Sequence, residues 1–75
     1  MREGYCKFFS ENKGFGFITD KDSGEDYFVY VSSLIDPIKK GDLVRFALGE
    51  GFNGKVAAFE VKKISLENKV NNKQD

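Results

Sequence analysis

Lys13-Gly14-Phe15-Gly16-Phe17-Ile18 is the stretch of this sequence that decides the fold. Side chains alternate between the two faces of a β-strand, so Phe15 and Phe17 share one face while the glycines lie on the other. Glycine inside a strand often marks a sharp bend or a close approach of another backbone. Strong curvature is what a small closed barrel requires. The stretch therefore predicts a bent strand that presents two aromatic rings on one face.

Short apolar runs separated by turn residues continue on both sides of this stretch. The expected strands cover residues 3–10, 15–19, 26–31, 43–48 and 55–64. Such spacing is typical of all-β barrels and sandwiches. We expect one helical turn at residues 33–35, in the connection that holds the only proline, Pro37.

The chain has 75 residues, which is room for one domain. We expect this domain to cover residues 1–65. Residues 66–75 are mostly Asn, Lys, Glu and Gln. Such a segment cannot bury enough apolar area to offset the entropy of ordering, so a flexible polar tail is predicted.

Too many aromatic rings are present for the interior of one small barrel. The chain has eight phenylalanines and three tyrosines, and a small barrel is just wide enough for side chains to fill it. Other apolar residues already supply an expected core: Cys6, Ile18, Val29, Val44, Phe46, Leu48, Val56, Ala58 and Val61. In the third strand, alternation places Phe28 and Tyr30 on the face opposite Val29 and Val31. Some of these rings are therefore predicted to lie on the surface.

Exposed aromatic rings can stack on unpaired nucleic-acid bases, and each stacked base contributes about 1–3 kcal/mol. Twelve basic and twelve acidic residues give a net charge of zero, so long-range attraction to phosphates is absent. Local phosphate contacts are still expected from lysine and arginine. The candidates are Lys7, Lys13, Lys39, Lys40, Arg45 and Lys55.

Several classes of protein are not expected from the composition. The single cysteine, Cys6, excludes an internal disulfide and is expected to be a small buried apolar residue. The chain has no histidine, no cluster typical of metal ligands and no phosphate-binding glycine loop. We therefore predict no catalytic residue, no metal and no cofactor. No apolar run is long enough to span a membrane, so a soluble cytoplasmic protein is expected.

Three motifs resemble, in order and spacing, those of the bacterial cold-shock protein family. They are Lys7-Phe8-Phe9, Lys13-Gly14-Phe15-Gly16-Phe17-Ile18 and Tyr27-Phe28-Val29-Tyr30-Val31-Ser32. The resemblance covers about residues 1–64. It implies a five-stranded antiparallel β-barrel of the oligonucleotide-binding class that binds single-stranded RNA or DNA. It also implies a role as RNA chaperone or as a regulator of transcription or translation.

The resemblance also implies which residues contact nucleic acid. By position these are Lys7, Phe8, Lys13, Phe15, Phe17, Asp26, Phe28, Tyr30 and Val31. Phe8 stands where the family usually has Trp, Tyr30 where it has His, and Val31 where it has Phe. The connection after the third strand is also shorter than usual and lacks the family's aromatic residue. Because Val cannot stack, we expect weaker binding than is typical of the family.

Two further residues in or beside the glycine-rich loop 49–54 are candidates for the site. Loops of this kind hold ligand in oligonucleotide-binding folds. Phe52 could replace the missing aromatic residue or could be an exposed ring without a role, and Lys55 could contact phosphate.

A protein-interaction module on the same barrel is the alternative function, because an aromatic patch can also anchor a protein partner. We expect a monomer, with a strand-swapped dimer as the alternative.

Overall fold

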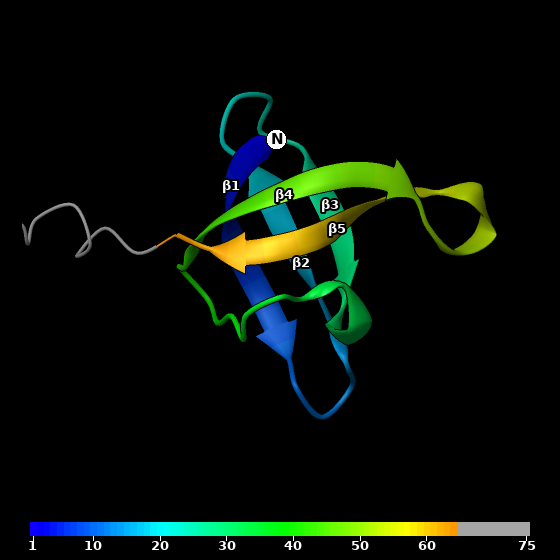
Figure 1. The fold of residues 1–75 in the computed structure, drawn as a ribbon, viewed down its shortest axis with the longest axis horizontal. Coiled ribbons are helices and arrows are strands. Elements are labelled where there is room, and N and C mark those ends of the chain that lie inside the picture. Colours follow the sequence, from blue (N-terminus) through cyan, green and yellow to red (C-terminus); the bar gives the residue numbers. More distant parts are fainter. Residues whose placement is uncertain (65–75) are drawn as a thin grey trace, which may run out of the picture.

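The computed structural model describes residues 1–64, apart from the side chain of Phe52. Five strands and two short 3-10 helices follow one another along the chain (Figure 1). They are β1 (Arg2–Ser10), β2 (Phe15–Asp20), β3 (Asp26–Tyr30), η1 (Val31–Ser33), β4 (Leu43–Glu50), η2 (Phe52–Gly54) and β5 (Val56–Lys63). All five predicted strands are thus confirmed. The predicted tail, residues 66–75, lies outside the described residues.

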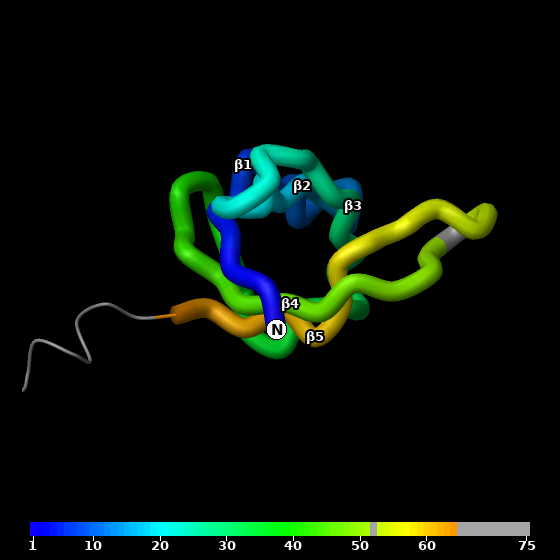
Figure 2. Tube along the Cα trace, turned by 90° about the horizontal axis from the view of Figure 1, so that it is seen from above, coloured from blue at the N-terminus to red at the C-terminus, as the bar shows by residue number. Residues whose placement is uncertain are grey.

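The strands close into a barrel in the order β1-β2-β3-β5-β4, with β4 pairing back onto β1. Seen from above, β1, β2 and β3 form one side of the barrel and β4 and β5 close the other (Figure 2). Every pairing is antiparallel except β3 with β5, which is parallel. The predicted five-stranded barrel is therefore confirmed, with one parallel pair at its closure.

Glycines on the inner face allow β1 and β2 to approach closely. A Cβ atom at Gly16 would lie 2.2 Å from the carbonyl oxygen of Phe8, and one at Gly4 would lie 2.3 Å from that of Thr19. No real Cβ contact is this short, and both neighbours are backbone atoms that cannot turn aside. Of the two readings of a glycine inside a strand, a sharp bend or a close approach of another backbone, the structure shows the close approach at Gly16.

The barrel is filled by aliphatic side chains and a single phenylalanine ring. The buried core contains Cys6, Ile18, Val29, Ile38, Val44, Phe46, Ala58 and Val61. Leu48 is partly buried against it. Burial raises the pKa of the Cys6 thiol, which suits the predicted role of a small apolar residue.

Three expectations about local structure were wrong. Val56 is 54% exposed instead of buried. It opens β5 where the β4–β5 hairpin projects beyond the barrel, so no interior lies beneath it (Figure 1). The helical turn begins at Val31 rather than at residue 33. The Val31 amide donates to the Gly14 carbonyl at 2.8 Å and then the chain turns, which leaves Val31 exposed instead of beside Val29 on the inner face.

Asp20 is the buried charged residue of the described chain, with 1% of its surface exposed. Its Oδ2 atom pairs with the Arg2 guanidinium at 2.9 Å. Its Oδ1 atom accepts hydrogen bonds from the amides of Asp22 at 2.8 Å and Ser23 at 3.0 Å. Asp20 thereby joins the start of β1 to the β2–β3 turn.

Candidate nucleic-acid interface

Five aromatic rings lie together on the outer face of three neighbouring strands. Phe8 of β1 is opposite Phe17 of β2, and Phe17 is opposite Phe28 of β3. Phe15 is opposite Tyr30 one row further along. We call this surface the aromatic platform, and its members are Phe8, Phe15, Phe17, Phe28 and Tyr30.

The rings of the platform contact one another in a continuous series. Phe28 lies at its centre, with centroids 5.1 Å from Phe15, 5.2 Å from Phe17 and 4.6 Å from Tyr30. Phe8 is 6.1 Å from Phe15 and 6.2 Å from Phe17. These separations and the mixture of stacked and edge-on angles are those of favourable aromatic pairs.

Each platform ring remains in part open to solvent. Phe8 is the most open, at 40%, and the other four are half-buried. The exposure is a consequence of the strand alternation, because the inward positions between these rings belong to Gly16, Ile18 and Val29. The structure therefore holds apolar π faces at the surface, where unpaired bases could stack on them.

A charged pair borders the platform. The Nζ atom of Lys7 lies 2.7 Å from Oδ2 of Asp26, and the Thr19 hydroxyl donates to Oδ1 of the same carboxylate at 2.7 Å. Lys7 and Thr19 hold the pKa of Asp26 below its usual value. Lys7 reaches this position from a bulge, because the β1–β2 register shifts between Cys6 and Phe8. Each oxygen of the Asp26 carboxylate therefore already has a hydrogen-bond partner.

A groove of about 460 Å³ runs from the platform to the end of the β4–β5 hairpin. Its lining is Phe17, Asp26, Phe28, Tyr30, Asn53, Lys55, Val56 and Ala57. Lys55 thus lies beside the platform, together with Asn53 and Val56, which the sequence analysis missed. The parallel pairing of Phe28 with Ala57 brings this loop to β3, and no sequence motif indicates that pairing.

The remaining predicted site residues are placed as follows. Lys13 is exposed in the turn between β1 and β2, where its backbone amide donates a hydrogen bond to the Ser10 hydroxyl at 3.2 Å. Val31 is 54% exposed directly after Tyr30. The side chain of Phe52 lies outside the described residues, so its role stays a prediction.

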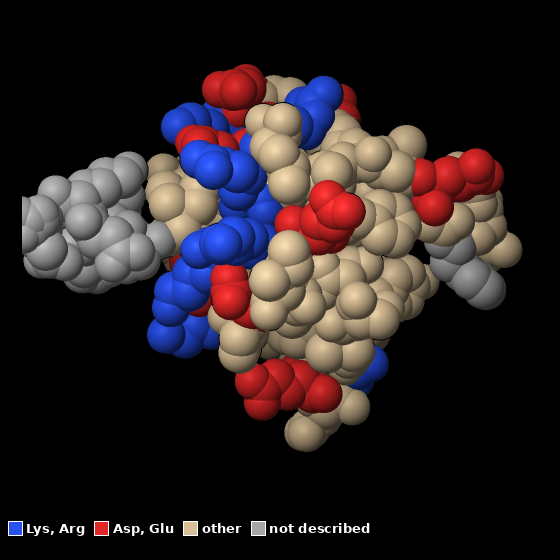
Figure 3. All heavy atoms as spheres, viewed as in Figure 1, with Lys and Arg blue, Asp and Glu red and all other residues tan. Residues whose placement is uncertain are grey.

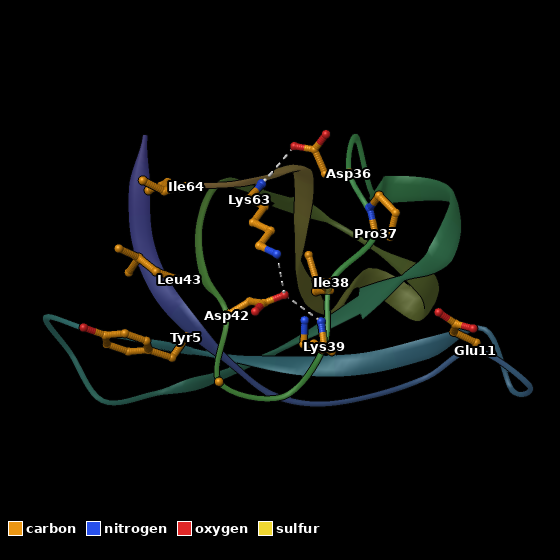
Figure 4. Close-up of a pocket in the computed structure, with 11 residues that line it drawn as sticks. Tyr5, Glu11, Asp36, Pro37, Ile38, Lys39, Asp42, Leu43, Lys63 and Ile64 are labelled. Carbon is orange, nitrogen blue, oxygen red and sulfur yellow. Dashed lines mark hydrogen bonds and ion pairs between the residues drawn. The ribbon is translucent and has the colours of Figure 1, made fainter. Parts of the chain in front are cut away.

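A larger hollow, of about 910 Å³, lies away from the platform, between the connection 36–42 and the end of β5 (Figure 4). Its carboxylates hold the backbone. Asp36 accepts from the Lys63 amide at 3.0 Å, and Asp42 accepts from the Lys39 amide at 2.9 Å. These contacts attach the connection to the barrel.

Within residues 1–64, no helix is long and apolar enough to cross a membrane. The same residues contain no group of three or more His, Cys, Asp or Glu side chains that could hold a metal ion.

Comparison with known proteins gives consistent matches over the described chain. Residues 2–64 match the family model of the 'Cold-shock' DNA-binding domain. Cold shock-like protein CspE of Escherichia coli K12 is 38% identical over 60 residues, which cover 75% of this chain and 87% of that protein. Cold shock-like protein CspE of Buchnera aphidicola subsp. Acyrthosiphon pisum is 40% identical with the same coverage.

Two longer proteins contain a similar region. Glycine-rich protein 2 of Nicotiana sylvestris is 40% identical over 63 residues, but the match spans only 29% of that protein. The solved structure of Drosophila Unr CSD456 has a TM-score of 0.69 and 21% identity, and covers 97% of this chain and 29% of the other. This structural likeness supports the fold. The alternative of a protein-interaction module is not favoured by these matches.

Proposed function

The chain belongs to the cold-shock DNA-binding domain family, and on this premise we propose that it binds single-stranded RNA or DNA by stacking unpaired bases on the aromatic platform. One observation carries the proposal: five partly exposed rings form one continuous surface across β1, β2 and β3. Bases in a duplex are already stacked on each other, so the platform selects single strands.

The expected affinity is moderate. Three stacked bases contribute roughly 3–9 kcal/mol before the cost of association, and the upper end of this range corresponds to ~micromolar binding. Because the net charge is zero, general attraction to phosphates adds little. The exposed Val31 ends the row of rings after Tyr30 and provides no further stacking face. The platform rings therefore supply most of the affinity.

Polar residues around the platform have separate roles in this proposal. Lys13 and Lys55 contact phosphates. Lys13 is exposed in the turn that leads into Phe15, and Lys55 is exposed at the groove. Lys7 contacts phosphate or stays with Asp26, and Asp26 accepts a hydrogen bond from a base edge at the unused lone pairs of its oxygens.

Moderate, stacking-based binding suits an RNA chaperone or a regulator of transcription or translation in the cytoplasm. Such a protein must release its strand so that the strand can pair. We further propose that the chain performs no catalysis in this role and acts as a monomer.

Titration of fluorescently labelled oligothymidine and oligouridine, followed by anisotropy, tests the proposal. A duplex of the same length is the control. We expect saturable binding of both single strands with a Kd of ~micromolar and much weaker binding of the duplex. Binding of the duplex as tight as that of the single strands would refute base stacking as the mechanism.

A further inference from the structure

A row of cations crosses the barrel surface beyond the platform, near the start of β1. Glu3 lies at its centre, with Oε1 3.1 Å from Nζ of Lys21 and Oε2 3.2 Å from the guanidinium of Arg45. Arg45 on β4 is directly opposite Lys62 on β5. We call Lys21, Arg45 and Lys62 the basic row. Two of its cations, Lys21 and Arg45, share a single carboxylate, that of Glu3.

The position of Lys62 is unfavourable for the isolated protein. Like charges that face each other across an antiparallel pair destabilise it, and Arg45 and Lys62 are such a pair. Within residues 1–64, no carboxylate lies within ion-pair distance of Lys62. An anion bound at this point would relieve the repulsion, so the arrangement favours a negatively charged ligand.

The positive charge of the β4–β5 face is concentrated in one part of it. Figure 3 shows Lys and Arg side chains gathered in one band over the start of β4 and the end of β5, on the side away from the projecting hairpin. The chain as a whole is neutral. Positive charge is thus concentrated on this surface although the net charge of the protein is zero. Such a surface attracts phosphates locally.

The outer face of β1 connects the platform to the basic row. From Phe8, the outward residues toward the N-terminus are Lys7, Tyr5 and Glu3. Tyr5 is 49% exposed and lies opposite Thr19 of β2 and Leu43 of β4. Tyr5 is two residues from Glu3 on the same outer face of β1, so it lies next to the carboxylate at the centre of the row. At about 3.4 Å per residue, Phe8 and Glu3 are roughly 17 Å apart.

We infer that a single strand longer than the platform continues along β1, stacks one base on Tyr5 and places its phosphates on the basic row. The inference rests on the proposed function, because the platform binds the first part of the strand. Oligonucleotide-binding folds hold about 4–16 nucleotides. An oligonucleotide of about four nucleotides fills the platform alone, and one of about twelve also reaches the row.

The salt dependence of binding distinguishes a strand bound to the platform alone from one that also reaches the basic row. For single strands, each phosphate neutralised contributes about −0.7 to the slope of log K against log salt. We expect the Arg45→Gln/Lys62→Gln variant to have a slope about 1.4 shallower than the wild type for the twelve-nucleotide oligothymidine, and an unchanged slope for the four-nucleotide one. The matched control, Arg45→Lys/Lys62→Arg, keeps both charges and should keep both slopes.

A second variant tests the path along β1. Tyr5→Leu keeps an apolar side chain and removes the π face, so it should weaken binding of the long oligothymidine several-fold and leave the short one unchanged. Circular dichroism melting of every variant verifies that it is folded.

The outcomes separate the two proposals. If the wild type fails to bind the four-nucleotide strand, the platform proposal fails. If the short strand binds, and the long strand keeps the wild-type salt slope in Arg45→Gln/Lys62→Gln, the basic row does not bind phosphates and the inference is overturned.

Discussion

Phe15 of β2 stacks on Phe28 of β3 with centroids 5.1 Å apart and planes 19° apart, although the two residues are diagonal in the ladder. The residue directly opposite Phe28 is Phe17, which meets it edge-on at 85°. Tyr30 contacts Phe28 from the next outward position of the same strand. Phe28 is therefore the ring on which three others depend for their orientation.

Replacement of Phe28 should weaken binding more than replacement of any other platform ring. Phe28→Ala removes one stacking face, worth about 1–3 kcal/mol, and also releases its three neighbours. We expect the Kd for oligothymidine to rise roughly 5- to 150-fold, and to rise less in Phe8→Ala. Anisotropy titration measures both values. The matched control is Tyr27→Phe, which changes a ring that packs against Phe46 and the core. Equal, small effects of Phe28→Ala and Phe8→Ala would contradict a central role for Phe28.

Gly16→Ala should destabilise the barrel. Its Cβ atom would lie 2.2 Å from the Phe8 carbonyl oxygen and 2.7 Å from Cα of Phe9, so β1 and β2 must separate. Overpacking of this kind costs about 1–3 kcal/mol or more. Gly49→Ala is the control, because its Cβ would meet only ring atoms of Phe59, at 3.0 and 3.1 Å. Urea unfolding should give Gly16→Ala the lower midpoint, and the reverse order would show that β1 and β2 can separate freely.

The buried Asp20 carboxylate should make stability depend on pH. The Ser23 amide, the Arg2 guanidinium and the Asp22 amide hold the pKa of Asp20 below its usual value. Because the folded pKa is lowered, its contribution to stability is present above the unfolded pKa of about 3.9 and is lost as pH falls through the folded pKa.

We therefore expect Asp20→Asn to lower the free energy of unfolding at pH 7 and to differ less from the wild type as pH falls below about 4. Urea unfolding at several pH values measures both quantities. Asp22→Asn is the control, because only the amide of this exposed residue contacts Asp20. A difference between Asp20→Asn and wild type that stays constant with pH would be inconsistent with this role.

Glu60 has a backbone conformation that favours glycine. Its φ is 53°, next to the irregularity in the β4–β5 pairing, and this left-handed region costs most residues roughly 1–2 kcal/mol. Glycine does not have this cost, although it loses about 0.5–1 kcal/mol in entropy. Glu60→Gly should therefore raise the free energy of unfolding by up to about 1.5 kcal/mol, whereas Glu60→Ala should not. Equal unfolding midpoints for the two variants would argue against backbone strain at this position.

The sequence predicted the platform well because it depends on strand alternation. Phe15 and Phe17 share a face through the period of two, and the alternating glycine makes the other face tight enough for a small barrel. The same reasoning correctly placed Val44 and Phe46 in the core. These features depend only on positions close together in the chain.

Features that depend on distant pairings could not be predicted. Asn53 and Val56 reach the groove because β5 pairs with β3 in parallel, although the whole of β4 separates the two strands in the sequence. The Lys7–Asp26 pair depends on a bulge in β1, which no residue type in the motif indicates. Val31 does not follow the expected in-and-out alternation of the strand, because its amide donates a hydrogen bond to the Gly14 carbonyl and the chain turns there. In each case a tertiary contact overrode the local pattern.

The most direct test of the central claim is the NMR ring-proton spectrum of the protein during titration with oligothymidine. Bases that stack on the platform shift the ring protons of Phe8, Phe15, Phe17, Phe28 and Tyr30 upfield, while those of the fully buried Phe46 stay in place. Shifts confined to residues of β4 and β5, with the platform rings unchanged, would contradict base stacking on the platform.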